Sequence, residues 1–172
     1  MPQYIQVIDE MKTLLLLRHA KSSWANEQLS DFERPLNERG HFDAPRIGEL
    51  LRVQDLVPDL IISSSAKRAA TTAEMVAISA SFEGDIRYTE KLYLAESETY
   101  IALARQVPDN YQVVMMVGHN PGIEELVEDL TGQSERMPTA ALACIELPIE
   151  KWSDMKAGKK NKLRGVWRPK EL

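Results

Sequence analysis

The 172-residue chain is poor in several residues and patterns that mark common protein classes. Its one cysteine, Cys144, excludes an internal disulfide and is typical of proteins in a reducing compartment. With three histidines and no spacing typical of zinc ligands, we expect neither a metal site nor another cofactor. The longest leucine run, 14–17, is too short to cross a membrane or to serve as the apolar part of a signal peptide.

The chain also lacks an excess of positive charge. It has 21 Lys and Arg residues against 26 Asp and Glu, a net charge of −5 that argues against a broad nucleic-acid-binding surface. Any anion must therefore be bound by a few placed arginines. With 44% hydrophobic and 27% charged residues, the composition is ordinary for a globular protein. We expect a soluble, cytoplasmic protein with an N-terminal extension over 1–11 and a single domain over 12–172, and the sequence leaves open whether Met1 or Met11 is its start.

Three apolar runs, 13–17, 60–63 and 113–117, predict buried strands. A helix pattern follows each strand; the first helix can be capped by Asn37, and the third can begin at Pro121. This alternation predicts a three-layer α/β/α fold with a mostly parallel central sheet.

The remaining segments give weaker patterns. We expect a strand at 86–88, a helix over about 98–106 capped by Ser97, and a last strand over 140–147. Residues 149–172 are interpreted as a basic, tryptophan-containing tail.

Polar side chains follow each of the three buried strands. Arg18 and His19 come directly after the first, Arg68 follows the second, and His119 follows the third. The carboxyl ends of parallel strands meet at one edge of a sheet, so these four residues are expected to converge. Two arginines, two histidines and the N-termini of the following helices suit a dianionic tetrahedral group such as phosphate.

Only one of the two histidines needs to be a nucleophile. A neutral imidazole whose Nδ1–H is held by a backbone carbonyl can attack phosphorus through Nε2, and water can then hydrolyse the phosphohistidine. The other histidine, as a cation or a neutral donor, would stabilise charge on the transferring phosphoryl group.

Three segments, LLRHA at 16–20, SSSAKRA at 63–69 and VGHNP at 117–121, resemble the signature segments of the histidine phosphatase superfamily. RHAKSSW at 18–24 and DFERPLNERG at 31–40 are more closely similar to SixA-type phosphohistidine phosphatases. The resemblance covers about 12–147. It implies a phosphoglycerate mutase-like fold, a nucleophile at His19, and a phosphate pocket completed by Arg18, Arg68 and His119.

The resemblance leaves the general acid unassigned. Superfamily members that cleave phosphate esters are said to use a carboxylate near the pocket, whereas SixA-type members look like the branch that lacks a clear one. The candidates here, none in a specific spacing, are Glu90, Glu96, Glu98 and Asp31.

Other assignments also stay open at this point. Lys67 is an alternative to Arg68 as the phosphate contact, and Lys21 and Ser22 either line the mouth of the site or belong to an ordinary loop. We expect a phosphohistidine-bearing protein as the substrate and no nucleic-acid or membrane partner. The alternatives are a small-molecule phosphomonoesterase, a phosphoglycerate mutase-like enzyme, or a phosphopeptide-binding module without turnover, which the intact His19 disfavours.

Overall fold

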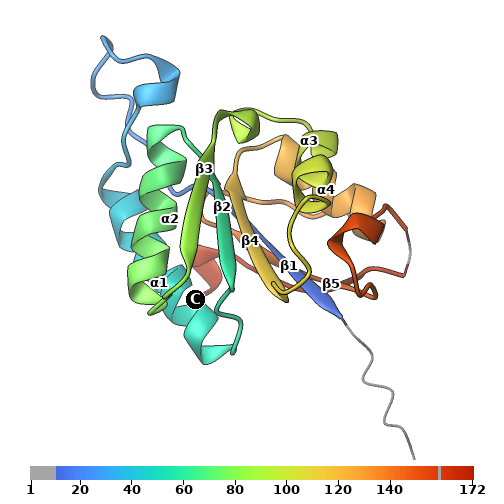
Figure 1. Cartoon of the computed structure of the whole chain (residues 1–172). Coiled ribbons are helices and arrows are strands. Elements are labelled where there is room, and N and C mark those ends of the chain that lie inside the picture. Colours follow the sequence, from blue (N-terminus) through green and yellow to red (C-terminus); the bar gives the residue numbers. More distant parts are fainter. Residues whose placement is uncertain (1–10, 159) are drawn as a thin grey trace, which may run out of the picture.

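A six-stranded sheet with helices on both faces forms the centre of the computed structural model, which describes residues 11–158 and 160–172 (Figure 1). The strand order is β3-β2-β4-β1-β5-β6. The strands are β1 (Lys12–Arg18), β2 (Leu60–Ser64), β3 (Asp85–Thr89), β4 (Val113–Gly118), β5 (Leu142–Leu147) and β6 (Lys162–Trp167). The helices are α1 (Glu38–Val53), α2 (Lys67–Ser79), α3 (Ser97–Ala104) and α4 (Gly122–Thr131). The predicted three-layer α/β class and the mostly parallel sheet are confirmed.

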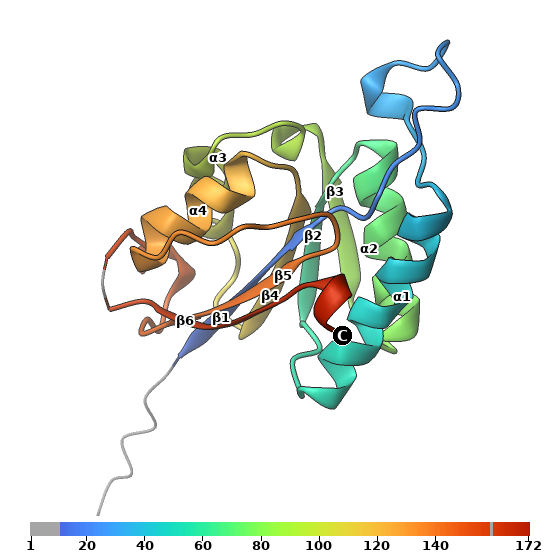
Figure 2. The same cartoon turned by 180° about the vertical axis from the view of Figure 1, so that it is seen from behind.

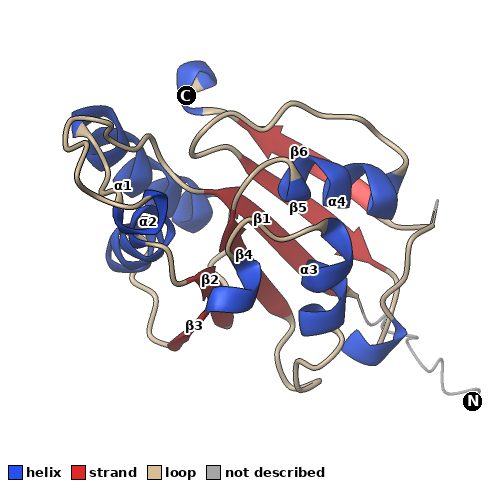
Figure 3. Cartoon of the chain, turned by 90° about the horizontal axis from the view of Figure 1, so that it is seen from above, coloured by secondary structure: helices blue, strands red, loops and turns tan. Residues whose placement is uncertain are grey.

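The leucine run of β1 lies inside the molecule and faces both helical layers. Successive side chains of a strand point to opposite faces of the sheet. Leu14 and Leu16 therefore join the buried cluster beneath α3 and α4, whereas Leu15 and Leu17 join the cluster beneath α1 and α2. Figure 2 and Figure 3 show the two helix pairs on opposite sides of the sheet. This double coverage explains why β1 is apolar at every central position instead of alternating.

The register of the parallel strands brings their carboxyl ends to one edge. β1 pairs with β4 so that Arg18 lies opposite Gly118, and β4 pairs with β2 so that Val117 lies opposite Ser63. β5 is antiparallel to β1 and begins at this same edge, with Leu142 opposite Leu17. Chain segments that leave β1, β2 and β4 therefore start from neighbouring points.

The interpretation of residues 149–172 as a tail is wrong. They contain β6, which pairs with β5, and two short 3-10 turns, Trp152–Asp154 and Pro169–Glu171. The last turn lies against α1, where the Arg46 guanidinium donates to the carbonyls of Pro169 at 3.3 Å and Leu172 at 2.9 Å (Figure 2). An edge strand buries little of either face, so β6 lacks the apolar run by which the central strands are found in the sequence.

Two helix starts differ from expectation. Ser97 does not cap α3; it is the first residue of the helix, and its hydroxyl donates to Asp129 of α4, which ties the two helices together. Pro121 precedes α4 as its cap residue, and Gly122 takes the first helical position. The strand expected at 86–88 is confirmed as part of β3. The extension expected over 1–11 lies almost wholly outside the described residues, and no described helix is long and apolar enough to span a bilayer.

The cap of α1 supplies a test of the local structure. The Asn37 side-chain oxygen accepts a hydrogen bond from the Gly40 backbone N–H at 3.0 Å, as its place in the sequence predicts. Asn37→Ala leaves that N–H without its partner, so we expect the free energy of unfolding to fall by about 1 kcal/mol. Asn37→Asp, which keeps an acceptor at this site, is the matched control. Urea unfolding measures both, and an alanine variant as stable as wild type would contradict the assignment.

Candidate active site

The four residues expected to converge lie around one cavity at the carboxyl edge of the sheet. Arg18 ends β1 and His19 follows it, Arg68 lies in the first turn of α2, and His119 follows β4. The two histidine ring centroids are 5.1 Å apart, and the cavity between these side chains has a volume of about 230 Å³. Both histidines and Arg68 are buried. The other lining residues are Lys21, Ser22, Trp24, Arg34, Leu94, Asn120 and Thr139.

The geometry of His19 defines which of its nitrogens is free. Nδ1 lies 2.8 Å from the Ala20 carbonyl oxygen, which can only accept, so Nδ1 carries the proton and Nε2 carries the lone pair. Burial lowers the pKa of His19 to about 3, and the positive charges of Arg68 and Arg18 act in the same direction. The imidazole is therefore neutral at pH 7. The next peptide is anchored as well, since Ala20 N donates to the Thr72 hydroxyl of α2 at 3.0 Å.

His119 is held from both its backbone and its ring. Its backbone N–H donates to the Tyr100 hydroxyl at 3.1 Å, and its Nε2 lies 2.8 Å from the Ser64 hydroxyl at the end of β2. Tyr93 packs edge-on against the ring with centroids 5.5 Å apart. Burial, followed by the charge of Arg68, lowers the pKa of His119 to about 4. Of the two forms considered from the sequence, His119 therefore takes the neutral one.

Asp31 organises the arginines of the cavity. Arg68 donates to the Asp31 carbonyl at 2.6 Å and to its carboxylate at 2.9 Å, and Arg34 Nε donates to the other carboxylate oxygen at 3.0 Å. The Tyr93 hydroxyl donates to the same carboxylate. Burial by itself would raise the pKa of Asp31, but the hydrogen bonds from Tyr93, Arg68 and Arg34 lower it to about 2. Asp31 is thus an anion at neutral pH and has no proton to give.

The other three carboxylates considered as a general acid do not reach the cavity. Glu90, Glu96 and Glu98 are exposed, and none of them lines it. The residues lining this cavity, within the described part of the chain, include no carboxylate at all. Residues 11–158 and 160–172 also contain no group of three or more His, Cys, Asp or Glu side chains that could hold a metal ion.

The structure also places the residues that were left as alternatives at the mouth of the cavity: Arg68 or Lys67, and Lys21 with Ser22. Arg68 lines the cavity, whereas the neighbouring Lys67 is exposed and does not. Lys21 is exposed at the rim, and the buried Ser22 hydroxyl accepts a hydrogen bond from Arg34 at 2.8 Å. The role of Arg34 was not predicted from the sequence. Its spacing of three from Asp31, which lets the two side chains pair within one turn, is the signal that was missed.

Trp24 extends this wall toward solvent. Its ring packs on the Arg34 guanidinium, whose Cζ lies 3.5 Å from the ring centroid, and its side chain stays largely exposed at the cavity rim. The stacking fixes the orientation of an arginine that also bonds Asp31 and Ser22.

Three buried nitrogens around the cavity make no hydrogen bond with any described residue: Arg18 Nε, Arg68 Nε and His119 Nδ1. A buried polar atom without a hydrogen-bond partner is costly, and a cavity lined by arginines favours a bound anion. The site therefore combines donors for a tetrahedral anion with a neutral imidazole whose Nε2 carries a lone pair.

A comparison against protein families identifies the family of the chain. The model of the histidine phosphatase superfamily, branch 1, matches residues 14–148, most of the chain. The chain belongs to the histidine phosphatase superfamily. It is accordingly a phosphatase, a hydrolase, and a histidine nucleophile is general to this superfamily.

Some similar proteins match most of the chain, and others match only a shorter stretch of it. A crystal structure from Agrobacterium tumefaciens, provisionally assigned as the phosphohistidine phosphatase SixA, has 34% identity and a TM-score of 0.78, covering 92% of this chain and 98% of that one. An uncharacterized protein of Mycobacterium tuberculosis is 31% identical over 83% of this chain and 93% of its own length. A 2,3-bisphosphoglycerate-dependent phosphoglycerate mutase of Bifidobacterium longum is 39% identical over a shorter stretch, 36% of this chain and 26% of the mutase.

The lowered histidine pKa values predict an unusual pH profile. A histidine nucleophile must be neutral, and a lowered pKa keeps it neutral as the pH falls. With pKa values of about 3 for His19 and about 4 for His119, both rings of the free enzyme stay neutral down to about pH 5. We expect kcat/KM for p-nitrophenyl phosphate, corrected for ionisation of the substrate, to stay level from pH 7.5 to 5.5. A histidine of ordinary pKa would lose about nine-tenths of its neutral form at pH 5.5, so a fall centred near pH 6.5 would contradict these shifts.

Proposed function

We propose that this protein is a phosphohistidine phosphatase of the SixA type, which removes the phosphoryl group from a phosphohistidine of another protein. His19 Nε2 attacks phosphorus, the bond from phosphorus to the substrate imidazole breaks, and that imidazole leaves. Water then attacks the phosphoryl group on His19, releasing inorganic phosphate and the free His19 ring.

The observation that carries this proposal is the state of His19. It is neutral, its Nδ1–H is held by the Ala20 carbonyl, and its ring stands 5.1 Å from that of His119 beside two arginines. These features support a nucleophile that needs no base to deprotonate it. A structural histidine would gain nothing from a cavity lined by several cations.

The roles of the other site residues follow from their donors. Arg18 and Arg68 bind the phosphoryl oxygens through charge-assisted hydrogen bonds, and His119 donates to the oxygen on which charge develops. Lys21 and Ser22 assist binding at the mouth. Each Nη atom of Arg68 donates one N–H to Asp31 and keeps a second N–H, which we assign to the substrate.

The absence of a carboxylate among the described residues of the cavity supports the substrate class. An alkyl phosphate expels an alkoxide, which needs a proton, and a positioned acid contributes about 10²- to 10⁴-fold. A phosphohistidine expels an imidazole that can leave already protonated, so this reaction does not depend on such an acid. The 34% identity to a provisionally assigned SixA protein supports the same substrate class.

With one buried cysteine, Cys144, the chain suits a reducing compartment, and the cytoplasm stays the predicted location.

One observation favours a second candidate, a small-molecule phosphomonoesterase or a phosphoglycerate mutase-like enzyme. It is the local match to a phosphoglycerate mutase at 39% identity. Such enzymes would need a proton donor for the leaving oxygen. The exposed Glu90 and Glu96 would then have to approach the cavity.

Turnover of substrates with different leaving groups separates the two candidates. We expect a phosphohistidine peptide and p-nitrophenyl phosphate to be hydrolysed readily, and glycerol phosphate and phosphoserine to have a kcat/KM lower by about 10²-fold or more. Glu90→Gln and Glu96→Gln should leave all four values unchanged, because neither carboxylate lines the cavity.

The opposite pattern identifies the alternative. If alkyl phosphates match aryl phosphates, and one of the two glutamine variants loses only the alkyl activity, an acid operates and the small-molecule candidate is correct. His19→Ala, inactive on every substrate, is the control for contaminating phosphatase.

A further inference from the structure

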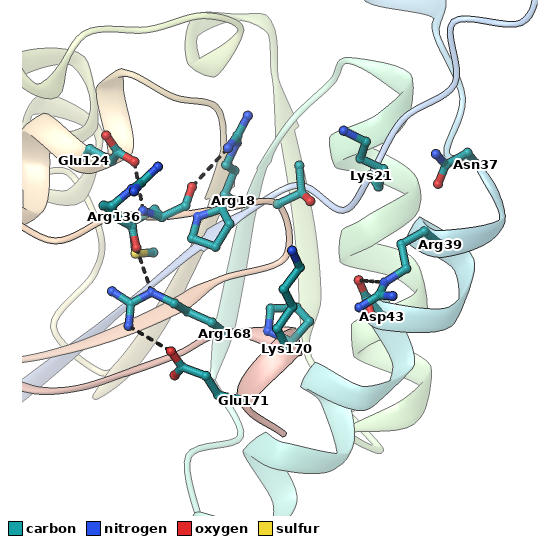
Figure 4. Close-up of a pocket in the computed structure, with 14 residues that line it drawn as sticks. Arg18, Lys21, Asn37, Arg39, Asp43, Glu124, Arg136, Arg168, Lys170 and Glu171 are labelled. Carbon is teal, nitrogen blue, oxygen red and sulfur yellow. Dashed lines mark hydrogen bonds and ion pairs between the residues drawn. The ribbon is translucent and has the colours of Figure 1, made fainter.

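A second and larger cavity, of about 760 Å³, adjoins the phosphate cavity. Arg18, Lys21 and Thr139 line both, so the two spaces meet at these residues. We call the larger one the basic groove. Its remaining lining residues are Asn37, Arg39, Asp43, Glu124, Arg136, Met137, Pro138, Arg168, Pro169, Lys170 and Glu171. Figure 4 shows Arg136 and Arg18 on one side of the groove, Lys21 and Arg39 on the other, and Lys170 between them.

Positive charge dominates the basic groove although the whole chain carries a net charge of −5. Six lining residues are basic and three are acidic. The acidic ones already have partners: Asp43 accepts from Arg39 at 2.9 Å, Glu171 lies 3.7 Å from Arg168, and the Glu124 carboxylate accepts from the amide of Asn120 and the backbone of Met137.

Three of the cations are uncompensated. Lys21, Arg136 and Lys170 are exposed, and their side chains make no ion pair or hydrogen bond with a described residue. They come from three distant parts of the chain: the loop after β1, the loop before β5 and the turn after β6. Like charges gathered around one groove repel one another, and this repulsion disfavours the compact fold. A bound anion offsets that repulsion.

We propose that the basic groove binds an acidic segment of the substrate protein that flanks the phosphohistidine held in the phosphate cavity. The inference rests on the proposed function and deepens it, since it names the chemistry around the target histidine. Each exposed cation binds one carboxylate only weakly because water and salt screen the pair. The separate cations therefore suit several carboxylates along one chain better than a single small anion.

Phosphohistidine peptides with different flanks test the proposal. One histidine is phosphorylated with phosphoramidate in three peptides, flanked by glutamate, serine or lysine. At low ionic strength the wild-type enzyme should prefer the glutamate flank over the serine flank by about tenfold in kcat/KM, equivalent to about 1.4 kcal/mol. In the double variant Arg136→Glu/Lys170→Glu, called the groove variant, the ratio of glutamate-flank to serine-flank kcat/KM should fall to about one or below. Neither residue lines the phosphate cavity, and the ratio cancels any general loss of activity.

Lys151→Glu/Lys162→Glu is the matched control, with the same change in charge. Both lysines are exposed and lie at the opposite edge of the sheet, after the end of β5 and at the start of β6. This variant should keep the wild-type ratio, and 0.5 M salt should reduce the ratio in the wild type. Equal rates for glutamate and serine flanks in the wild type would overturn the inference. An unchanged ratio in the groove variant, or an equal loss in the control variant, would overturn it too.

Failure of the proposed function has a different signature. If no peptide is hydrolysed while p-nitrophenyl phosphate is, the substrate class is wrong, and the peptides become competitive inhibitors. The basic groove is then judged by their inhibition constants. Stronger inhibition by the glutamate-flanked peptide in the wild type, lost in the groove variant, keeps the groove as a carboxylate site. Equal inhibition constants for the three peptides would overturn the inference that the basic groove binds carboxylates.

Discussion

The parallel register of β1, β4 and β2 is the constraint on which the site depends. Arg18 is paired with Gly118, so the histidine that follows each strand emerges beside the other, and the two rings stand 5.1 Å apart. A shift of one residue in this register would turn the leucines of β1 to the wrong faces of the sheet. The same shift would also move the two histidines apart. The burial that stabilises β1 between two helical layers therefore also fixes the distance between the two histidines.

Burial at this edge has a second consequence, for charge. The cavity is enclosed enough to keep both histidines neutral, yet it contains three arginines. Buried cations need anionic partners, and Asp31 supplies one by bonding Arg34 and Arg68 together. The carboxylate that looked like a candidate acid is in this structure a fixed anion that positions the arginines. The bonds from Arg34 and Arg68 to Asp31 thus explain both how the two arginines are oriented and why Asp31 is not a proton donor.

The sequence predicted the parts of this arrangement that rest on strong local patterns. The leucine and valine runs identify β1 and β4 because strands buried on both faces are apolar throughout, and Asn37 marks the start of α1 because its cap is a local hydrogen bond. β6 was not predicted, because this edge strand mixes charged and apolar residues and so lacks a continuous apolar run. The bonds of Ser97 to Asp129 and of Arg68 to Asp31 join residues far apart in the chain, so only the assembled fold reveals them.

The most direct test of the account is the chemical identity of the phosphorylated enzyme. Wild-type protein mixed briefly with p-nitrophenyl phosphate, quenched with base and mapped by mass spectrometry should carry a phosphoryl group on His19 that is stable to base and lost in acid. His19→Ala should carry none and should retain less than about a hundredth of the activity, because loss of a nucleophile costs more than the ~2.7 kcal/mol that this factor represents. Phosphate mapped to another residue, or a His19→Ala variant above that level, would contradict the account.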